Sequence, residues 1–437
     1  MIVLFILLAL LVLLMMVTIH EFGHYVAGKL LGFKINEFSI GFGPSLFSHK
    51  CKSGEYFSIR IIPLGGYCAF EGEENDSENS GAFMKQKPWK RLIVLFNGAF
   101  FNFISAILFC FIMLVSVGYD IPKVYEVDPV VRVDSVVYTN AEGGYTTENF
   151  VFEENDKIIK IGEKAYNQPL ALNQVGSALV EITKDLPVGS GYFYTIEIER
   201  NGTTLDIRPI MYCTKQTNVG TLETSLQKGD VILKVNGVNI DFIKDNYFNS
   251  LISNVAENSD TVDLTIRRNG EEKLLTLNLY ETGIKNSEGI YSKAMGVKSE
   301  AYKFTFGESL IRCIPYTFGF SWKVLGALGS LITGQAGIND VGGPIYTIGT
   351  IANLSSQSLA YFLTLLPLIA ANLAIFNWLP FPALDGSKMV FTTIEWIRGK
   401  PLFSQKTENL IHNIGFFLLL ALVFIADFYH IIVGLFW

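Results

Sequence analysis

The stretch IHEFGH, residues 19 to 24, directly follows an apolar run at residues 1 to 18. On a helix, positions i and i+4 share a face, so His20 and His24 can bind one metal ion, with Glu21 beside that face. Zinc favours such ligands, and catalytic zinc sites use three protein ligands and one open position. Alternatively, the histidines are only polar residues at a helix end. Because ionisable groups inside a span are usually functional, the pattern predicts zinc.

Two histidines leave one ligand missing, and the segment NLAIFNWLPFPALDGSK, residues 372 to 388, offers a candidate. Pro380 and Pro382 must interrupt a helix there, and Asp385 follows the apolar run. An interrupted helix at membrane depth is tolerated where its freed backbone groups face protein or a watery cavity. On its own, Asp385-Gly386 would be read as an interfacial turn. The incomplete zinc shell makes Asp385 the predicted third ligand.

The composition indicates the class of protein that contains these residues. Of 437 residues, 50% are hydrophobic and only 17% are charged, which indicates an integral membrane protein. The net charge of -7 comes without a basic patch, so nucleic acid is not an expected partner. The five cysteines form no C-x-x-C pair, which argues against a disulfide framework or a thiolate zinc site.

Four apolar stretches are long enough to cross a bilayer. They are residues 1–27, 92–118, 361–386 (broken, with the Leu-Asp-Gly sequence) and 414–437. The first is taken as a span rather than a cleaved signal, since no Lys or Arg precedes it. Lys and Arg concentrate in the two connections between spans one and two and between spans three and four, which predicts a cytoplasmic position for both. Both termini and residues 119–307 would then lie outside.

The outer segment contains an internal repeat. Asp156 matches Asp230 at a shift of 74 residues, and Asn201 matches Asn269 at a shift of 68. Each copy combines alternating strands, a helical stretch and an Asn-Gly hairpin, and resembles the PDZ domain, most visibly in the sequence Gly-Asp-Val-Ile at residues 229–232. Two inserted PDZ-like α+β domains are therefore predicted, at 121–210 and 211–283. They would bind extended peptides as an added strand, or only exclude large folded proteins.

Two further regions are expected to contact the membrane. Residues 38–70, including EYFSIRIIPLGGYCAF, alternate apolar and polar side chains and predict a membrane-associated β-hairpin on the cytoplasmic side. Its edge would pair with an extended substrate, or the hairpin would simply pack on lipid headgroups. Residues 304–351 are apolar but interrupted by glycines, which predicts an amphipathic connecting region on the outer side.

These motifs together resemble the site-2 protease family of intramembrane zinc metalloproteases, and more narrowly its bacterial RseP group with PDZ domains. The resemblance covers nearly the whole chain. It rests on His-Glu-Phe-Gly-His at 20–24, Gly-Phe-Gly-Pro at 41–44, Pro-Leu-Gly-Gly-Tyr at 63–67, and Asn377, Pro380, Pro382 and Leu-Asp-Gly at 384–386. Two positions depart from the family pattern: Ala99, where a proline is usual, and Ser387, where a glycine is frequent.

The resemblance implies a role for each of these residues. His20, His24 and Asp385 would bind Zn²⁺, Glu21 would act as the catalytic acid and base toward a zinc-activated water, and Asn377, Pro380 and Pro382 would help to hold the substrate. Zn²⁺ would be the one cofactor.

The predicted fold is a polytopic α-helical membrane protein with four transmembrane helices, two PDZ-like domains and a β-hairpin. The predicted function is cleavage of transmembrane segments of single-span proteins, such as anti-sigma factors or remnant signal peptides. The setting would be the bacterial inner membrane, with lipid and peptide ligands of the PDZ-like domains as further partners. The alternatives are a non-enzymatic PDZ scaffold with a structural metal site, and a metal-ion transporter.

Overall fold

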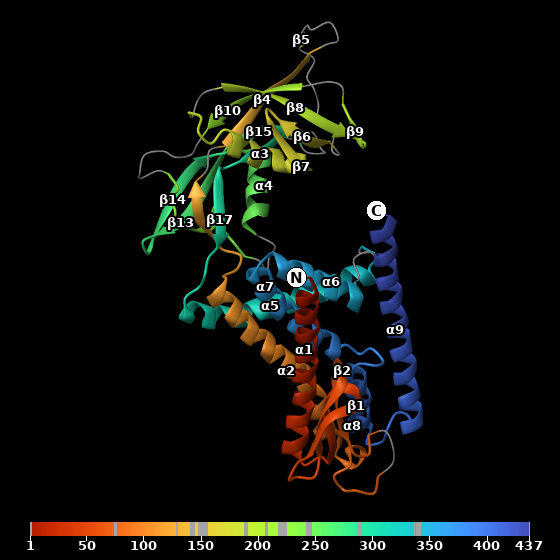
Figure 1. The fold of residues 1–437 in the computed structure, drawn as a ribbon. Coiled ribbons are helices and arrows are strands. Elements are labelled where there is room, and N and C mark those ends of the chain that lie inside the picture. The colour runs from red at the N-terminus through yellow and green to blue at the C-terminus, as the bar shows by residue number, and fades with distance from the viewer. Residues whose placement is uncertain are drawn as a thin grey trace. The chain divides into compact units, whose positions relative to one another are not determined.

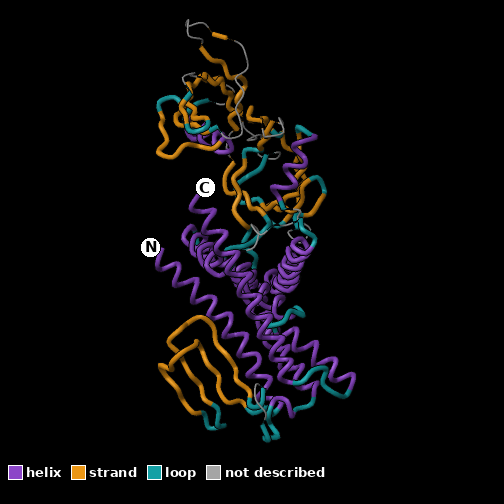
Figure 2. The backbone as a smooth tube through the Cα atoms, turned by 90° about the vertical axis from the view of Figure 1, so that its right-hand side faces the viewer, coloured by secondary structure: helices purple, strands orange, loops and turns teal. Residues whose placement is uncertain are grey.

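The computed structural model divides into two compact units, one of residues 1–117 and 303–437 and one of residues 118–302. It describes residues 2–73, 77–127, 130–139, 145–146, 156–187, 191–205, 209–216, 225–241, 247–285, 291–335, 337 and 342–436. Figures 1 and 2 show the elements of each unit. We refer to residues 1–117 and 303–437 as the helical unit and to residues 118–302 as the β unit.

The helical unit is built mainly from long helices. They are α1 (Ile2–Leu31), α2 (Pro88–Ser116), α5 (Phe306–Ile332), α6 (Pro344–Gln357), α7 (Leu359–Trp378), α8 (Asp385–Arg398) and α9 (Gln405–Phe436), with a short 3-10 turn at Phe83–Lys85. Within the described residues, four helical segments are long and apolar enough to cross a membrane, at Leu4–Leu31, Pro88–Ser116, Ala360–Trp378 and Gln405–His430. Four spans were predicted, and the expectation of an integral membrane protein is confirmed.

The bounds of the spans differ from the prediction in one informative way. The third span ends at Trp378, whereas residues 361–386 were predicted as one broken helix. Leu379 is extended, and a new helix, α8, starts at Asp385. Proline has no backbone N–H to donate in a helical hydrogen bond. Pro380 and Pro382 therefore separate a spanning helix from a second, less apolar helix.

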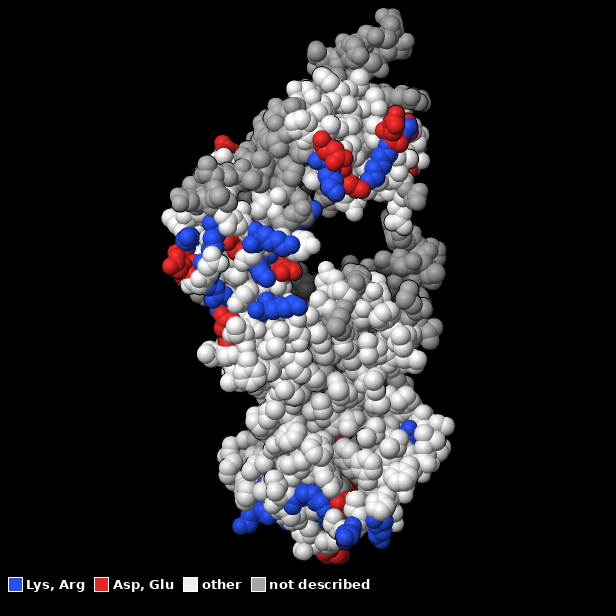
Figure 3. Space-filling model, turned by 60° about the vertical axis from the view of Figure 1, so that its left-hand side comes forward, with Lys and Arg blue, Asp and Glu red and all other residues white. Residues whose placement is uncertain are grey.

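The surface of the helical unit is divided by charge. In Figure 3, a wide belt of this unit carries neither acidic nor basic side chains, and the charged residues gather at the end that bears β1, β2 and α8. Exposed leucine, isoleucine and phenylalanine side chains follow α9 over most of its length, among them Phe417 and Phe424. Such a belt fits contact with lipid chains.

Two long strands, β1 (Ile35–Lys50) and β2 (Tyr56–Phe70), form an antiparallel pair in the helical unit. Both strands fold back on themselves, so the pairing places four short runs together, as Figure 2 shows. Run 35–40 pairs with run 66–70 and with run 56–59, and run 45–50 pairs with run 56–60. Run 66–70 therefore has only one strand neighbour within the described residues, and its other edge is free of strand pairing.

A cluster of buried apolar side chains holds the folded strands against α1 and α2. Its members are Ala27, Phe33, Ile35, Phe38, Cys68, Phe70, Phe83, Val94 and Leu95. Burying this apolar area fixes the position of run 66–70 relative to the end of α1 that carries the histidines.

The β unit contains two larger sheets. One has the order β5-β4-β10-β8-β6-β7, with β9 paired to β8, and the other has the order β14-β13-β11-β3-β17, with β12 paired to β11. The first uses β4 (Val130–Thr139), β5 (Tyr145–Thr146), β6 (Lys157–Ile161), β7 (Lys164–Ala171), β8 (Gly191–Arg200), β9 (Thr203–Thr204), β10 (Pro209–Gln216) and helix α3 (Leu172–Ile182). The second uses β3 (Pro122–Val127), β11 (Val231–Val235), β12 (Val238–Asn239), β13 (Thr261–Arg268), β14 (Glu271–Asn278), β17 (Val297–Ala301) and helix α4 (Phe248–Asn258). A separate hairpin joins β15 (Tyr280–Lys285) to β16 (Tyr291–Ala294).

The two sheets are not consecutive in the chain, which corrects the predicted domain boundaries. Strand β3, which falls within the predicted domain 121–210, pairs with β11 and β17 of the second sheet. The second sheet also extends beyond residue 283, because β17 is one of its edges. The first module is therefore inserted between β3 and β11 of the second, a nesting that a repeat search along the sequence cannot detect.

The repeat itself is present in three dimensions. Arg200 donates from Nε and Nη2 to the two carboxylate oxygens of Asp156 at 2.7 and 2.8 Å, and Arg268 makes the same paired contact with Asp230 at 2.7 and 2.6 Å. Each arginine precedes an Asn-Gly turn in which both residues have positive φ, as a tight hairpin of this type requires.

Candidate functional site

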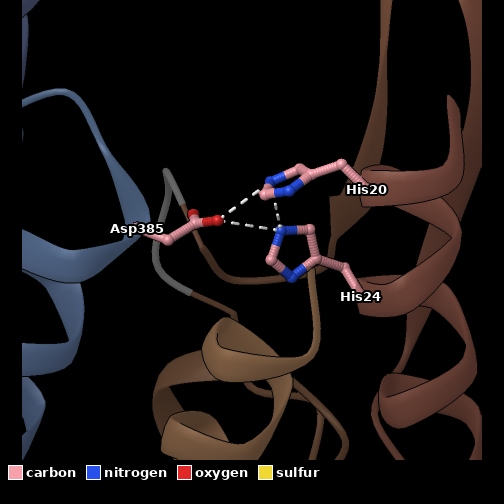
Figure 4. Close-up of side chains that lie close together, drawn as sticks. All are labelled: His20, His24 and Asp385. Carbon is pink, nitrogen blue, oxygen red and sulfur yellow. Dashed lines mark hydrogen bonds and ion pairs between the residues drawn. The ribbon is translucent and has the colours of Figure 1, made fainter. Parts of the chain in front are cut away.

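Three predicted ligands meet in the helical unit, although Asp385 lies 361 residues after His24. Figure 4 shows both imidazole rings extending from α1 toward the carboxylate of Asp385. His20 Nε2 lies 3.0 Å and His24 Nε2 lies 3.1 Å from Asp385 Oδ2, and the two Nε2 atoms are 3.1 Å apart. Two ligands at zinc-nitrogen or zinc-oxygen distances of about 2.0 Å in a tetrahedron would be roughly 3.3 Å apart. The donor set and its spacing fit one zinc ion.

Both histidines are buried, with 8% of His20 and 7% of His24 exposed. The Nδ1 of His24 lies 2.8 Å from the carbonyl oxygen of Val94 on α2. This hydrogen bond assigns the proton of a neutral ring to Nδ1 and leaves Nε2 free as a ligand. Within the described residues, the Nδ1 of His20 is buried without a partner.

The close approach of α2 to α1 depends on glycine. A Cβ atom on Gly98 would overlap the Nε2 of His24, and one on Gly23 would overlap the carbonyl oxygen of Asn97. Both positions therefore require a residue without a side chain, because neighbouring backbone or ring atoms fill the space. Gly98 opens the G-x-x-x-N pattern of the second span, whose proline is replaced by the fully buried Ala99.

The break after α7 places Asp385, the predicted third ligand, beside the histidines. Leu379 is extended, Ala383 has a φ of 92°, and Asp385 is the first residue of α8. A Cβ atom on Gly386 would overlap the carbonyl oxygen of Leu379, so the chain turns back tightly on itself. Ser387, the second departure from the family pattern, is buried and donates its hydroxyl to the carbonyl oxygen of Leu384 at 2.8 Å. This serine supports the turn and leaves the ligand in place.

Glu21 faces the folded strands. Its Oε2 accepts a hydrogen bond of 2.9 Å from the backbone N–H of Cys68, in the middle of run 66–70. The strand thus holds the carboxylate beside the two histidines. Burial raises the pKa of the Cys68 thiol, so this side chain remains a neutral neighbour.

A cavity of about 950 Å³ opens onto these groups. Its lining includes His20, Glu21, His24 and Asp385, together with Tyr67 to Glu73 from the end of β2 and its following turn. Lys388, one helical turn after Asp385, also lines it and lies 2.8 Å from Glu73. The charge of Glu73 raises the pKa of Lys388, which stays protonated.

The three residues expected to hold substrate are placed differently. Asn377 is the penultimate residue of α7, and Pro380 and Pro382 form the break, but none of them lines the cavity. Pro382 instead packs against Gly415 of α9, where a Cβ atom would overlap it. The prolines shape the chain around Asp385, and their contact with substrate remains a prediction.

Sequence reasoning missed three contributors to the site. The carbonyl of Val94 and the amide of Cys68 are backbone groups, so the residue types at these positions do not indicate their role. Gly98 is a glycine within an apolar span, and the histidine that it accommodates is contributed by a different helix, so its role cannot be inferred from its own segment.

Residues 8–422 match the family model described as Peptidase family M50. The chain is 30% identical over 443 residues to the Regulator of sigma E protease of Haemophilus influenzae, an alignment that covers 94% of this chain and 95% of the relative. It is 27% identical over 442 residues to Protease RseP of Yersinia pestis, with 94% and 95% covered.

Proposed function

The chain belongs to peptidase family M50, the zinc-dependent site-2 type of metalloprotease, and from this we propose that it hydrolyses peptide bonds within membrane-spanning segments of single-span proteins. The observation that carries the proposal is the meeting of His20, His24 and Asp385 within hydrogen-bond distance, next to Glu21, in a helical unit with four candidate spans.

We assign His20, His24 and Asp385 as the zinc ligands and Glu21 as the acid and base. When bound, zinc supplies Lewis acidity and lowers the pKa of water. The Glu21 carboxylate takes a proton from the attacking water and passes it to the leaving amine. The hydrogen bond from Cys68 orients this carboxylate, and the ring of His24 is oriented by Val94.

Substrate presentation follows from the free edge of run 66–70. A membrane helix hides its peptide groups in internal hydrogen bonds, so it must unwind before hydrolysis. The edge of run 66–70 lines the same cavity as Glu21 and can pair with an extended chain by strand addition. An unwound substrate would be held there with its backbone next to the zinc ligands.

The name of the relative, Regulator of sigma E protease, supports anti-sigma factors as substrates. Remnant signal peptides are the second group of substrates in the proposal. We assign the charged end of the helical unit to the cytoplasm, following its Lys and Arg residues. The site would then lie near the cytoplasmic side of a bacterial inner membrane. The β unit, outside the membrane, would bind peptides or exclude bulky substrates through its PDZ-like modules.

Replacement of Glu21 by Gln tests the proposal, because it keeps the shape of the side chain and removes the base. The full chain in detergent or vesicles should lose cleavage of a single-span model substrate while its zinc content stays at one ion per chain. Glu78→Gln, at a fully exposed carboxylate, is the matched control and should cleave normally. Retained cleavage in Glu21→Gln would contradict the assignment of Glu21 as the acid and base.

A further inference from the structure

The helical unit contains a second cavity, of about 420 Å³, that the proposed chemistry does not use. Residues of α2, α8, α9 and the turns before α2 enclose it. Its lining residues are Glu73, Phe83, Met84, Arg91, Leu95, Lys388, Thr392, Gln405, Glu408, Asn409, His412 and Asn413. We call it the flank chamber.

The flank chamber shares a wall with the catalytic cavity. Glu73, Phe83, Leu95 and Lys388 line both. The chamber also lies at the charged end of the unit, since α9 begins there with Gln405 and α8 borders it (Figure 1). A chain held beside the zinc ligands and continuing toward that end would reach this space next.

The charges of the flank chamber are unevenly matched. Lys388 is bonded to Glu73 at 2.8 Å, and Arg91, only 3% exposed, is bonded to Glu395. The carboxylate of Glu408 makes no hydrogen bond or ion pair with any residue that the structure describes. Lys388 and Arg91 attract Glu408 at longer range, but each is paired directly with another carboxylate. Glu408 therefore differs from Glu73 in having no direct cation partner among the described residues.

The rest of the lining combines three apolar side chains with polar ones, and one of the polar atoms has no partner within the described residues. Gln405 and Asn413 bring side-chain amides to it, and Thr392 brings a hydroxyl. The Nε2 of His412 is buried and has no partner within the described residues. A buried polar atom without a partner costs free energy, which favours a ligand or water at that position. The chamber therefore has the features of a binding site for a hydrophilic, positively charged group.

We propose that the flank chamber receives a Lys or Arg side chain of the substrate, from the cytoplasmic flank of the scissile bond, with Glu408 as its partner. This inference rests on the proposed function. Single-span membrane proteins carry an excess of Lys and Arg beside the cytoplasmic end of the span, so the ligand is present in the proposed substrate class. Glu408 would distinguish substrates by flank charge and fix how far the chain advances past the zinc ligands.

The test compares two model substrates that differ only at one cytoplasmic-flank position, Lys or Gln, with the full zinc-loaded chain in detergent. The wild type should cleave the Lys substrate with the higher kcat/KM. Glu408→Gln should lower kcat/KM for the Lys substrate about tenfold, mainly through KM, as expected for the loss of one charge-assisted hydrogen bond. It should leave the Gln substrate unchanged. Glu408→Lys should prefer a third substrate with Glu at the same position.

The matched control is Glu78→Gln, which removes an exposed carboxylate outside the chamber and should not alter the preference. Equal kcat/KM of the wild type for the Lys and Gln substrates would overturn the inference and leave the proposed function intact. An equal loss for both substrates in Glu408→Gln would overturn it too, as a structural effect. Absence of cleavage of any substrate by the zinc-loaded wild type would instead count against the proposed function.

Discussion

Asp385 of the helical unit and Asp230 of the β unit are both largely enclosed carboxylates that contact two side-chain nitrogen atoms, yet they are bound in different ways. Asp230 is 1% exposed, and each of its oxygens accepts from one nitrogen of Arg268. Its Oδ2 also accepts from the backbone N–H of Gln227. Asp385 has a side chain 17% exposed and offers one oxygen, Oδ2, to two imidazole nitrogens.

The difference is the one expected between a structural aspartate and a proposed metal ligand. A guanidinium is always charged and matches a carboxylate with two parallel hydrogen bonds, so the Asp230 pair is complete without any other group. Two imidazoles whose Nε2 atoms converge on one oxygen form a donor set that a metal cation completes. Burial and short distances are shared by both sites, and only the partner chemistry distinguishes them.

The same substitution at both aspartates should have opposite effects on zinc binding. Asp385→Asn should abolish stoichiometric zinc and lower cleavage by about 10³-fold or more, because the metal supplies several kcal/mol of transition-state stabilisation. Asp230→Asn should keep both zinc and cleavage at the catalytic centre and reduce the stability of the second module. Metal analysis and a cleavage assay on the same samples give the result. Loss of zinc in Asp230→Asn would contradict the distinction.

The two arginine–aspartate pairs of the β unit differ in how far their arginines are exposed. Arg268→Met should destabilise its module by about 3 kcal/mol, since it leaves Asp230 buried without a counter-ion. Arg200→Met should cost less, about 1–2 kcal/mol, because its side chain is 23% exposed against 10% for Arg268. Hydrogen exchange of the amides of β8 and β13 in the full chain measures both. Equal effects would show that exposure does not set the strength of these pairs.

Sequence reasoning succeeded where local spacing carries the information. The i, i+4 histidines and the apolar spans depend only on helix periodicity, and the Asn-Gly hairpins depend on two adjacent residues. Asp385 was predicted only because two histidines leave the zinc shell incomplete. No local sequence pattern indicates a ligand 361 residues away from His24. In the structure the Oδ2 of Asp385 lies 3.0 and 3.1 Å from the Nε2 atoms of the two histidines, and its role as a metal ligand stays a prediction.

Sequence reasoning failed where position depends on the path of the chain. Strand β3 lies next to the first module in sequence but pairs in the second sheet, because the first module is inserted between β3 and β11. The hairpin prediction covers residues 38–70. It could not find that run 66–70 lies beside Glu21, because a buried apolar cluster from several segments sets that position.

Gly98→Ala tests how tightly the metal centre is packed. The added methyl group would displace His24, and a disturbed ligand orientation is expected to weaken zinc binding by about 10- to 100-fold. Gly326→Ala, on α5 with open space around it, is the control and should leave zinc affinity unchanged. Competition with a chelator measures the affinities. Unchanged affinity in Gly98→Ala would mean that α2 can move away without cost.

Glu55 offers a graded test, because it is a further buried carboxylate and its charged partner is a lysine. Only 3% exposed, it lies 2.8 Å from the Nζ of Lys29, at the end of α1, and also accepts from Ser53 and Tyr25. Although burial alone would raise its pKa, these hydrogen bonds lower the pKa of Glu55 to about 2. The pKa is thus lower in the folded than in the unfolded chain.

The sign of the pH dependence follows from that order of pKa values. The contribution of Glu55 to stability is fully present above its unfolded pKa of about 4.5 and is lost as the pH falls toward 2. We expect about 2 kcal/mol, because Lys29 is one-third exposed and solvent screens the pair. Glu55→Gln should therefore be less stable than wild type at pH 7 and approach it at pH 3, in hydrogen exchange of β1 and β2. Both proteins lose zinc equally on acidification, so the difference between their stabilities reports the Glu55–Lys29 pair alone. A stability difference that stays constant from pH 7 to pH 3 would assign Glu55 a role independent of its charge.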